Sequence, residues 1–469
     1  MPLIFYDTET TGTEIFFDQI LQFAAIQTDE TLTETDRFAI RSRLLPHLVP
    51  APGAVRVTGV TVAELSNPLS PSHYEMVRLI HEKLLSWSPA LFIGWNSIEF
   101  DEDLVRLALY MTLHNPYLTG RHGNSRSDAM RMAQACSIFC PGVLTFPTDE
   151  KGRNIFKLQQ VALANGLKNP KAHDAVADAE TSIQICRLIL DRAPDVWSSF
   201  MRFSSKASVV SFITEEPVFC LSDCFFGQPF SWICTVIGQS QDNSADWYVF
   251  NLEVDPATLR RLSATALAVR LKQQPKPVRK IKSNSAPMLC PSEDAPEVCK
   301  GRAIRARELE RRAALLQADA EFRQRLIAAF ESLREEYPVS LHVEEQIYDA
   351  FVKEEDEELM ESFHKAEWPV RLVIVEKFQD LRLRTIGKQL IHLERPDLLD
   401  KSTRRGYRIA AARRLLGQGE DISWLTLPKA IDELQQMIAT TSGAESKVLR
   451  EHLQYLRARH KQALLHIKG

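Results

Sequence analysis

The sequence predicts a layered α/β domain with a mixed sheet at the N-terminus, followed by a small β-domain and a helical C-terminal region. Three changes of pattern support this division. Short apolar runs alternate with amphipathic stretches up to about residue 190, aromatic and β-branched residues dominate between 207 and 271, and the pattern is helical from about residue 300. A chain of 469 residues is also too long for one compact core.

The first region begins with two apolar runs separated by a polar turn, which predict adjacent strands. A later apolar run predicts another buried strand, and three stretches with apolar residues at helical spacing predict helices. The expected strands are 3–7 (LIFYD), 20–29 (ILQFAAIQTD) and 90–96 (ALFIGWN), and the expected helices are 73–87, 101–113 and 174–190.

The second region contains three β-rich runs that predict a small barrel or β-domain, over residues 207–221, 230–238 and 246–255. The stretch 273–297 is rich in proline and charge, so we expect it to run extended over the surface. Residues 306–337 and the segment that follows are expected to be helical.

The composition is that of an ordinary soluble globular protein, with 45% hydrophobic and 25% charged residues. No apolar run approaches the roughly 20 residues of a membrane helix, and no secretory signal is visible. Eight cysteines, with the pairs Cys136/Cys140 and Cys220/Cys224 but no matched zinc-ligand set, indicate reduced thiols in the cytoplasm. Because the net charge is −4, any positive surface for nucleic acid must be local.

Two acids, Asp7 and Glu9, follow the first apolar run, one residue apart. Residues i and i+2 of a strand point to the same face, so both would project from the carboxyl end of that strand, the edge at which open α/β sheets bind ligands. Neighbouring anions repel each other unless a cation separates them, and their hard oxygens suit Mg²⁺ or Mn²⁺. An isolated D-x-E triplet is more simply a solvated turn.

Three further residues near helix starts could join this edge. Asp101 stands at a strand–helix junction, where it can cap the helix and face the same edge. His173 precedes a helix that Asp174 can cap, and Asp178 lies about one turn inside it. Each has an ordinary alternative, because Asp101 can be only a cap, a lone histidine near a cap is usually structural, and Asp178 can complement the helix dipole.

In this order, "DTETTG" (7–12), "N-x-x-x-F-D" (96–101) and "H-D-A-x-x-D" (173–178) resemble the motifs of the DEDDh 3′→5′ exonuclease superfamily. Further stretches, including "PGAVRVTGVT" and "VEEQIYDAF", are similar to the bacterial exonuclease I family, which acts on single-stranded DNA. The resemblance implies an RNase H-like exonuclease domain, an SH3-like β-barrel domain with an extended basic segment, and a C-terminal helical domain, over residues 1–192, 193–337 and 338–469.

The resemblance also implies an activity. The expected enzyme is an exodeoxyribonuclease of DNA repair and recombination that degrades single-stranded DNA processively, 3′→5′, to 5′-mononucleotides. Two Mg²⁺ ions, or Mn²⁺, would be held by Asp7, Glu9, Asp101 and Asp178, since two ions can serve both oxygens of an in-line displacement. His173 would act as the general base.

For DNA contact, the resemblance points to Glu9, Arg106, Tyr117 and Lys157. Lys157 stands where an arginine is expected, so the charge is kept but bidentate phosphate binding is lost. The ordinary alternatives are surface cations for Arg106 and Lys157 and a core aromatic for Tyr117.

Two basic runs, 269–282 and 402–414, could follow the strand or form solvated faces, and Tyr407 could stack on a base or pack inside its domain. Exonuclease I enzymes also bind the C-terminal tail of single-stranded DNA-binding protein, but residues 137–146 lack the arginine expected nearby. A clamp closed by one chain favours a monomer. The rival functions are a DEDDh exoribonuclease of the oligoribonuclease or RNase T type, usually a shorter chain, and a non-catalytic DNA-binding scaffold.

Overall fold

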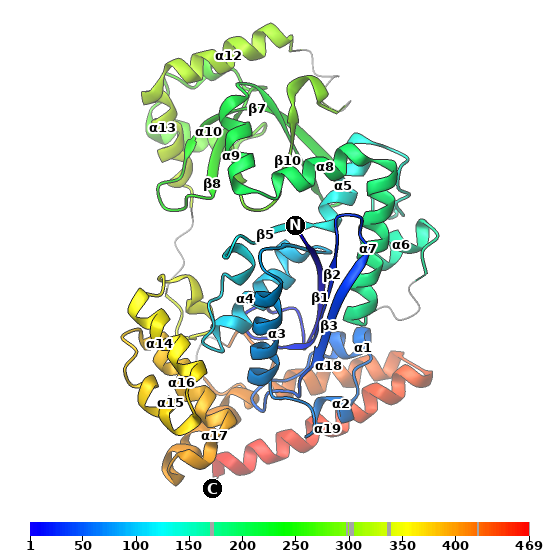
Figure 1. Ribbon diagram of the computed structural model, residues 1–469, viewed down its shortest axis with the longest axis vertical. Helices are drawn as coiled ribbons and strands as arrows, with labels where there is room; N and C mark the ends of the chain where they lie inside the picture. Colours follow the sequence, from blue (N-terminus) through cyan, green and yellow to red (C-terminus); the bar gives the residue numbers. More distant parts are fainter. Residues whose placement is uncertain (169–172, 297–298, 300–303, 335–338, 420–421, 469) are drawn as a thin grey trace.

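The molecule divides into the three parts that the sequence predicts. A mixed α/β domain lies in the middle, a second sheet with its helices lies above it, and the C-terminal helices cover its lower side (Figure 1). The computed structural model describes residues 1–468 except for 169–172, 297–298, 300–303, 335–338 and 420–421.

The first sheet consists of β1 (Leu3–Thr10), β2 (Ile20–Thr28), β3 (Glu34–Arg41), β4 (Leu91–Gly94) and β5 (Ser125–Asp128). Their order is β3-β2-β1-β4-β5. β1 pairs antiparallel with β2 and parallel with β4, so the predicted mixed sheet is confirmed. β1 is hydrogen-bonded to a neighbouring strand on each side. This pairing fixes its register, and therefore the face of the sheet to which each of its side chains points.

Helices cover both faces of this sheet, because the first half of β1 is apolar on both sides. Leu3, Ile4, Phe5 and Tyr6 are all buried, and each such side chain contributes about 1.5–3 kcal/mol to stability. The Ile4 face packs under α3 (His73–Trp87) and α4 (Asp101–Tyr110), and the Phe5 face packs under α5 (Ala129–Phe139) and α7 (Ala175–Arg192). The remaining helices of this region are α1 (Pro52–Thr58), α2 (Val62–Leu65), α6 (Leu158–Ala164) and α8 (Pro194–Phe203).

The second sheet is antiparallel throughout, which confirms the predicted β-domain. Its strands are β6 (Phe219–Phe225), β7 (Gln228–Gln239), β8 (Asp246–Asn251), β9 (Val278–Lys282) and β10 (Met288–Pro291), in the order β10-β6-β7-β8-β9. Its helices are α9 (Lys206–Glu215), α10 (Ala264–Lys272), α12 (Ala306–Ala318) and α13 (Ala320–Glu331).

Two predictions for this region are wrong in part. Residues 206–215, expected to be β-rich, form helix α9, which Ser205 caps by accepting from the amide of Ser208. The β-branched residues that suggested a strand instead place Val209 and Ile213 on one side of the helix, packed against the sheet. The stretch 273–297, expected to lie extended on the surface, supplies strands β9 and β10, because buried residues such as Ile281 join the core.

The C-terminal helices pack directly on the first domain. Phe363 and Ile386 share a core with Tyr74 and Leu107 of the first domain, and Leu449 of α19 packs with the apolar side of α1. The helices are α14 (Glu354–Lys365), α15 (Trp368–Val375), α16 (Leu381–Glu394), α17 (Lys401–Leu416), α18 (Leu427–Thr440) and α19 (Gly443–Lys468), and α19 runs along the lower edge below α1 and α2 (Figure 1).

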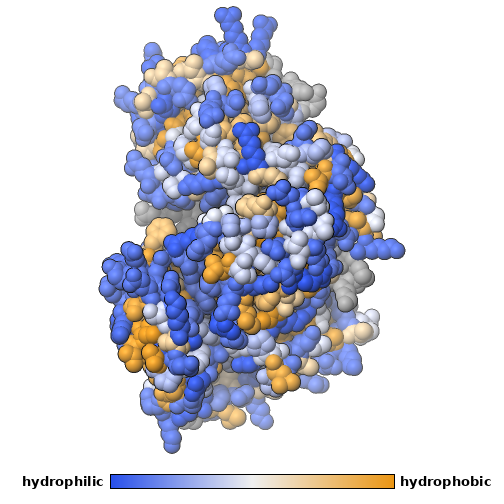
Figure 2. Space-filling view, viewed as in Figure 1, coloured by the Kyte–Doolittle hydropathy of each residue, from blue (hydrophilic) through white to orange (hydrophobic). Residues whose placement is uncertain are grey.

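The surface is largely hydrophilic on the face seen in Figure 2, with a few apolar patches. One patch at the lower left lies in the region of α14 and α15, where Val370 and Val373 are exposed. A membrane-crossing helix would need a long apolar stretch, and none of the helices in the described part of the chain has one.

Candidate active site

The carboxyl end of β1 carries the first two acids. Asp7 and Glu9 are both partly buried and point to the same face, whereas Thr8 between them points to the other. Asp7 pairs with Ala24 and Glu9 with Gln22 of β2, so the strand persists through both residues. The predicted projection of the two acids from the end of the first strand is confirmed.

The start of α7 supplies the next two groups. Asp174 is the N-cap and accepts from the amide of Ala177 at 3.4 Å, as the sequence predicts. His173 therefore precedes the helix, and Asp178 lies buried in its first turn. The helix start is also tied to the sheet, because Gln22 and Arg41 each donate to Asp174 Oδ2 at 3.1 Å.

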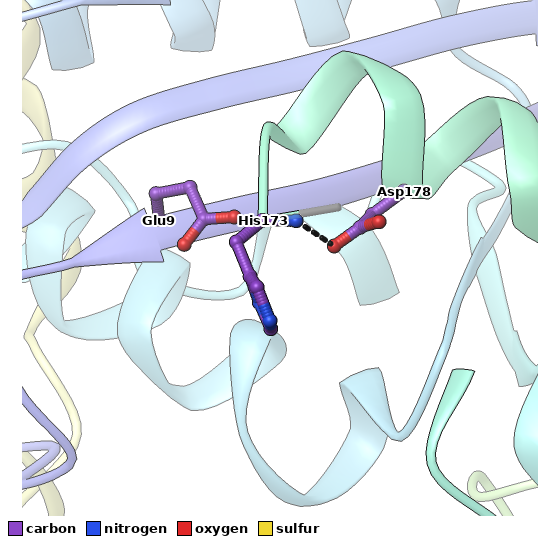
Figure 3. Close-up of side chains that lie close together, drawn as sticks. All are labelled: Glu9, His173 and Asp178. Carbon is purple, nitrogen blue, oxygen red and sulfur yellow. Dashed lines mark hydrogen bonds between the residues drawn. The ribbon is translucent and has the colours of Figure 1, made fainter. Parts of the chain in front are cut away.

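The side chains of Glu9, His173 and Asp178 meet in one place. One ligand atom from each lies within 4.8 Å of the others, and Figure 3 shows the three side chains together between β1 and α7. The amide of His173 donates to Asp178 Oδ2 at 3.2 Å, and Gln159 donates to the same oxygen at 3.2 Å. Two stretches more than 160 residues apart in the sequence thus supply one polar centre.

Asp101 approaches the same centre from α4. It is the first residue of the helix and not its cap, because Phe100 holds the N-cap position, so the predicted capping role is wrong. Its Oδ1 accepts instead from the amide of Thr8 at 3.1 Å and from Thr8 Oγ1 at 2.5 Å. These bonds fasten α4 to β1 directly beside the two strand acids.

The pKa values show that the carboxylates repel one another. Burial first, and then the charges of Asp101, Asp178 and Glu9, raise the pKa of Asp7 well above its usual range. Burial and the charges of Asp178 and Asp101 raise the pKa of Glu9 to about 8. Burial also raises the pKa of Asp101 to about 7, although the bonds from Thr8 lower it in part. Four carboxylates held this closely need a cation to be ionised together at neutral pH.

These residues fit a divalent metal. The donor set is mainly carboxylate oxygen, which Mg²⁺ and Mn²⁺ prefer. The geometry, the burial and the raised pKa values all describe a place where positive charge would be stabilising.

The three residues other than Glu9 that were predicted for DNA contact lie in different settings. Arg106 is mostly buried and donates to Glu102, Asp103 and the Tyr348 hydroxyl, so it is not an ordinary surface cation. Tyr117 is half-buried, with the Arg106 guanidinium 5.6 Å from its ring centre and the Phe351 ring 6.5 Å away.

Lys157 is exposed and immediately precedes α6. It lines a shallow groove with Trp95 and Phe226. The groove therefore joins the first domain to the tip of a hairpin from the second sheet.

The other basic candidates are divided by the fold. The run 269–282 falls partly on α10 and partly on β9. In the run 402–414 on α17, Tyr407 stacks on His392 at 4.4 Å, and Arg414 forms an ion pair with Glu344 at 2.6 Å. None of the eight cysteines, all of which lie in the described part of the chain, forms a disulfide, as predicted.

Sequence reasoning missed the residues that hold the acids in place. Thr8, Gln22 and Gln159 each bond to an acid of the site or its neighbour, yet none was assigned a role from the sequence, although Thr8 lies within "DTETTG". Only Gln22 had a usable signal, since an antiparallel partner strand places it beside Glu9.

Comparison with known proteins follows the same division of the chain. The family described as exonuclease matches residues 4–186, and the family described as exonuclease I C-terminal domain matches residues 341–459. Exodeoxyribonuclease I of Escherichia coli (strain K12) is 26% identical over 374 residues, which cover 76% of this chain and 78% of that protein. Exodeoxyribonuclease I of Haemophilus influenzae is 24% identical over 386 residues, with the same two shares.

Solved structures match over nearly the whole chain. The crystal structure of Escherichia coli exonuclease I in complex with a dA16 oligonucleotide has a TM-score of 0.84 at 21% identity, covering 98% of this chain and 99% of that one. Exonuclease I from Methylocaldum szegediense has a TM-score of 0.83 at 22% identity, with the same coverage. The chain thus combines a match to the exonuclease family with a match to the exonuclease I C-terminal domain, in this order, and it shares the fold of exonuclease I over nearly its full length.

Proposed function

We propose that this chain is a metal-dependent exodeoxyribonuclease that degrades single-stranded DNA in the 3′→5′ direction and releases 5′-mononucleotides. One observation carries the proposal: Glu9, His173 and Asp178 converge within 4.8 Å at the end of β1, beside Asp7 and Asp101. The relatives named exodeoxyribonuclease I support the choice of DNA as substrate.

Asp7, Glu9, Asp101 and Asp178 would hold two divalent cations, with Mg²⁺ as our choice and Mn²⁺ as the alternative. When bound, such ions lower the pKa of an attacking water and stabilise the leaving 3′ oxygen. One relative, Escherichia coli exonuclease I with single-stranded DNA, has been solved in a zinc-bound form, which supports metal binding by a protein of this fold.

His173 is suited to take the proton from the attacking water. Its backbone is left-handed, with φ of 66°, and its amide is bonded to Asp178, so the side chain leaves the helix start between Glu9 and Asp178 (Figure 3). Imidazole is the side chain that most often takes a proton in general-base catalysis. Glu9 would also contact the terminal nucleotide.

The strand would be held by Arg106, Tyr117 and Lys157, through phosphate charge and base stacking. An exonuclease I structure has been described as suggesting how processivity is achieved, and we propose processive action for this chain as well. We further propose that it works as a monomer in the cytoplasm, in DNA repair and recombination.

A time course on 5′-labelled single-stranded DNA tests the proposal. With Mg²⁺ we expect progressive shortening from the 3′ end, and with a chelator or with Asp178→Asn we expect none. The matched control is Asp397→Asn, an exposed acid far from the site. Faster cleavage of RNA of the same sequence would favour the exoribonuclease alternative, and full activity of Asp178→Asn would overturn the assigned centre.

A further inference from the structure

The hairpin between β6 and β7 exposes three phenylalanine rings. The exposed fractions are 43% for Phe225, 87% for Phe226 and 40% for Phe230. Phenylalanine is normally buried, so three exposed rings within six residues are unusual. A contiguous apolar patch of this kind on a soluble domain marks a binding surface.

The tip of this hairpin has a conformation that does not favour phenylalanine. The two-residue turn has φ of 52° at Phe226 and 72° at Gly227, the pattern of a type I′ turn. Asparagine or aspartate usually occupies the first of these positions, because a bulky side chain there is strained. The ring of Phe226 is therefore placed in solvent at a local conformational cost.

The hairpin is fixed to the first domain. The amide of Asn154 donates to the carbonyl of Gly227 at 3.1 Å. A Cβ atom at Gly227 would collide with the carbonyl of Asn154, so only glycine permits this approach. The exposed rings are thus held at a constant position relative to the catalytic domain.

The fixed tip forms one wall of a groove between the hairpin and the first domain. Phe226 lines it with Trp95, Phe156 and Lys157. Lys157 immediately precedes α6, whose Gln159 donates to Asp178 Oδ2 at 3.2 Å. The groove therefore places the hairpin beside a predicted phosphate contact that lies two residues before a side chain bonded to the acid cluster.

The rings continue along one face of the second sheet. Phe225 and Phe230 lie on the same face, with ring centres 5.7 Å apart. Phe230 stacks on the buried Trp232, with ring centres 6.0 Å apart and an angle of 7° between the ring planes. The Arg279 guanidinium lies 3.3 Å from the Trp232 ring centre. The negative charge of Asp223, which lies on this face, is compensated by an ion pair with Arg131, with Nη2 and Oδ1 3.6 Å apart. Exposed aromatic faces beside cations are what sequence-neutral binding of single strands uses.

We propose that Phe225, Phe226 and Phe230 form a platform on which bases of the single strand stack outside the active site. Arg279, which lies over the ring of Trp232, attracts the phosphate backbone of the strand to these three rings. This inference rests on the proposed function, because it assigns a further binding surface to the same substrate.

Binding without hydrolysis tests the platform. The probe is a fluorescein-labelled dT20 strand, with divalent metal chelated and salt held constant, measured by anisotropy. Phe226→Ala and Phe230→Ala should each weaken binding by about 5- to 150-fold, the range for losing one stacked base. The control, Leu69→Ala, removes another largely exposed apolar side chain and should bind as the wild type does.

A second strand, with abasic sugars in place of the bases, separates stacking from other effects. The wild type should bind it more weakly than dT20 by a similar factor, and the alanine variants should lose nothing further on it. Phe226→Leu keeps an apolar side chain at a solvent-exposed site, so it tests the loss of the ring without a risk to folding.

The outcomes distinguish the two proposals. Failure of the wild type to bind dT20 would overturn the proposed function itself. Wild-type binding that Phe226→Ala, Phe226→Leu and Phe230→Ala leave unchanged would overturn the platform alone. Equal losses by the variants on dT20 and on the abasic strand would also overturn it, because stacking requires bases.

Discussion

Replacement of Glu9 by glutamine should stabilise the metal-free protein at alkaline pH. Burial and neighbouring carboxylates raise the pKa of Glu9 from 4.5 to about 8. Between these two values the folded state binds more protons than the unfolded state, so stability falls as the pH rises through this window. Glutamine keeps the size of the side chain but has no charge to desolvate or repel.

The size of the effect follows from the pKa shift. A shift of this extent corresponds to at most about 5 kcal/mol, at about 1.36 kcal/mol per unit. Glu9 is only partly buried, and water screens part of the repulsion, so we expect about 2 kcal/mol at pH 8.5. For a domain of about 190 residues, this amounts to an increase in Tm of about 4–8 °C.

Thermal unfolding in chelator at pH 5.0 and pH 8.5 measures this. Glu9→Gln should melt close to the wild type at pH 5.0, where the wild-type carboxyl is protonated, and clearly above it at pH 8.5. Added Mg²⁺ should raise the Tm of the wild type more than that of the variant. Glu361→Gln, at an exposed helix position, is the matched control. The reasoning is refuted if Glu9→Gln melts at or below the wild-type temperature at pH 8.5.

Three further changes test other parts of the site. His173→Ala should slow cleavage about 10²–10⁴-fold in single-turnover assays while leaving DNA binding unchanged, and a parallel loss of binding would contradict its role as base. Thr8→Val removes a donor from Asp101 and should weaken Mg²⁺ binding by about 1.5–3 kcal/mol in calorimetric titration, whereas Thr8→Ser should retain it. Glu102→Gln removes the buried carboxylate that pairs with both Arg106 and Arg126 and should lower the unfolding free energy by about 3–5 kcal/mol; an unchanged urea midpoint would count against this.

The acids of the site were predictable because local rules place them. Strand alternation puts Asp7 and Glu9 on one face, and the capping position of Asp174 sets His173 before α7 and Asp178 inside it. The resemblance then assigned their roles. The spacing of residues along the chain does not predict contacts between distant elements. The role of Thr8, whose hydroxyl donates to Asp101, was therefore not predicted.

The errors have a common physical origin. Residues 206–215 carry strand-favouring side chains, but a serine cap and packing against the second sheet make them helical. Arg106 is expected either to contact DNA or to be a surface cation, yet two acids of its own helix enclose it. In both cases the contacts that the helix makes, and not the character of single residues, decide the outcome.

The packing of α19 against α1 has a consequence for folding during synthesis of the chain. His452 bonds to the carbonyl of Val60, a partner 392 residues earlier, and Ala51, just before α1, donates its amide to the carbonyl of Thr11 next to the catalytic strand. Because ribosomes add about 5–20 residues per second, the apolar side of α1 is exposed for roughly 20–80 s before α19 has been synthesised. During translation, the apolar side of α1 must therefore remain uncovered by α19 until almost the whole chain has emerged.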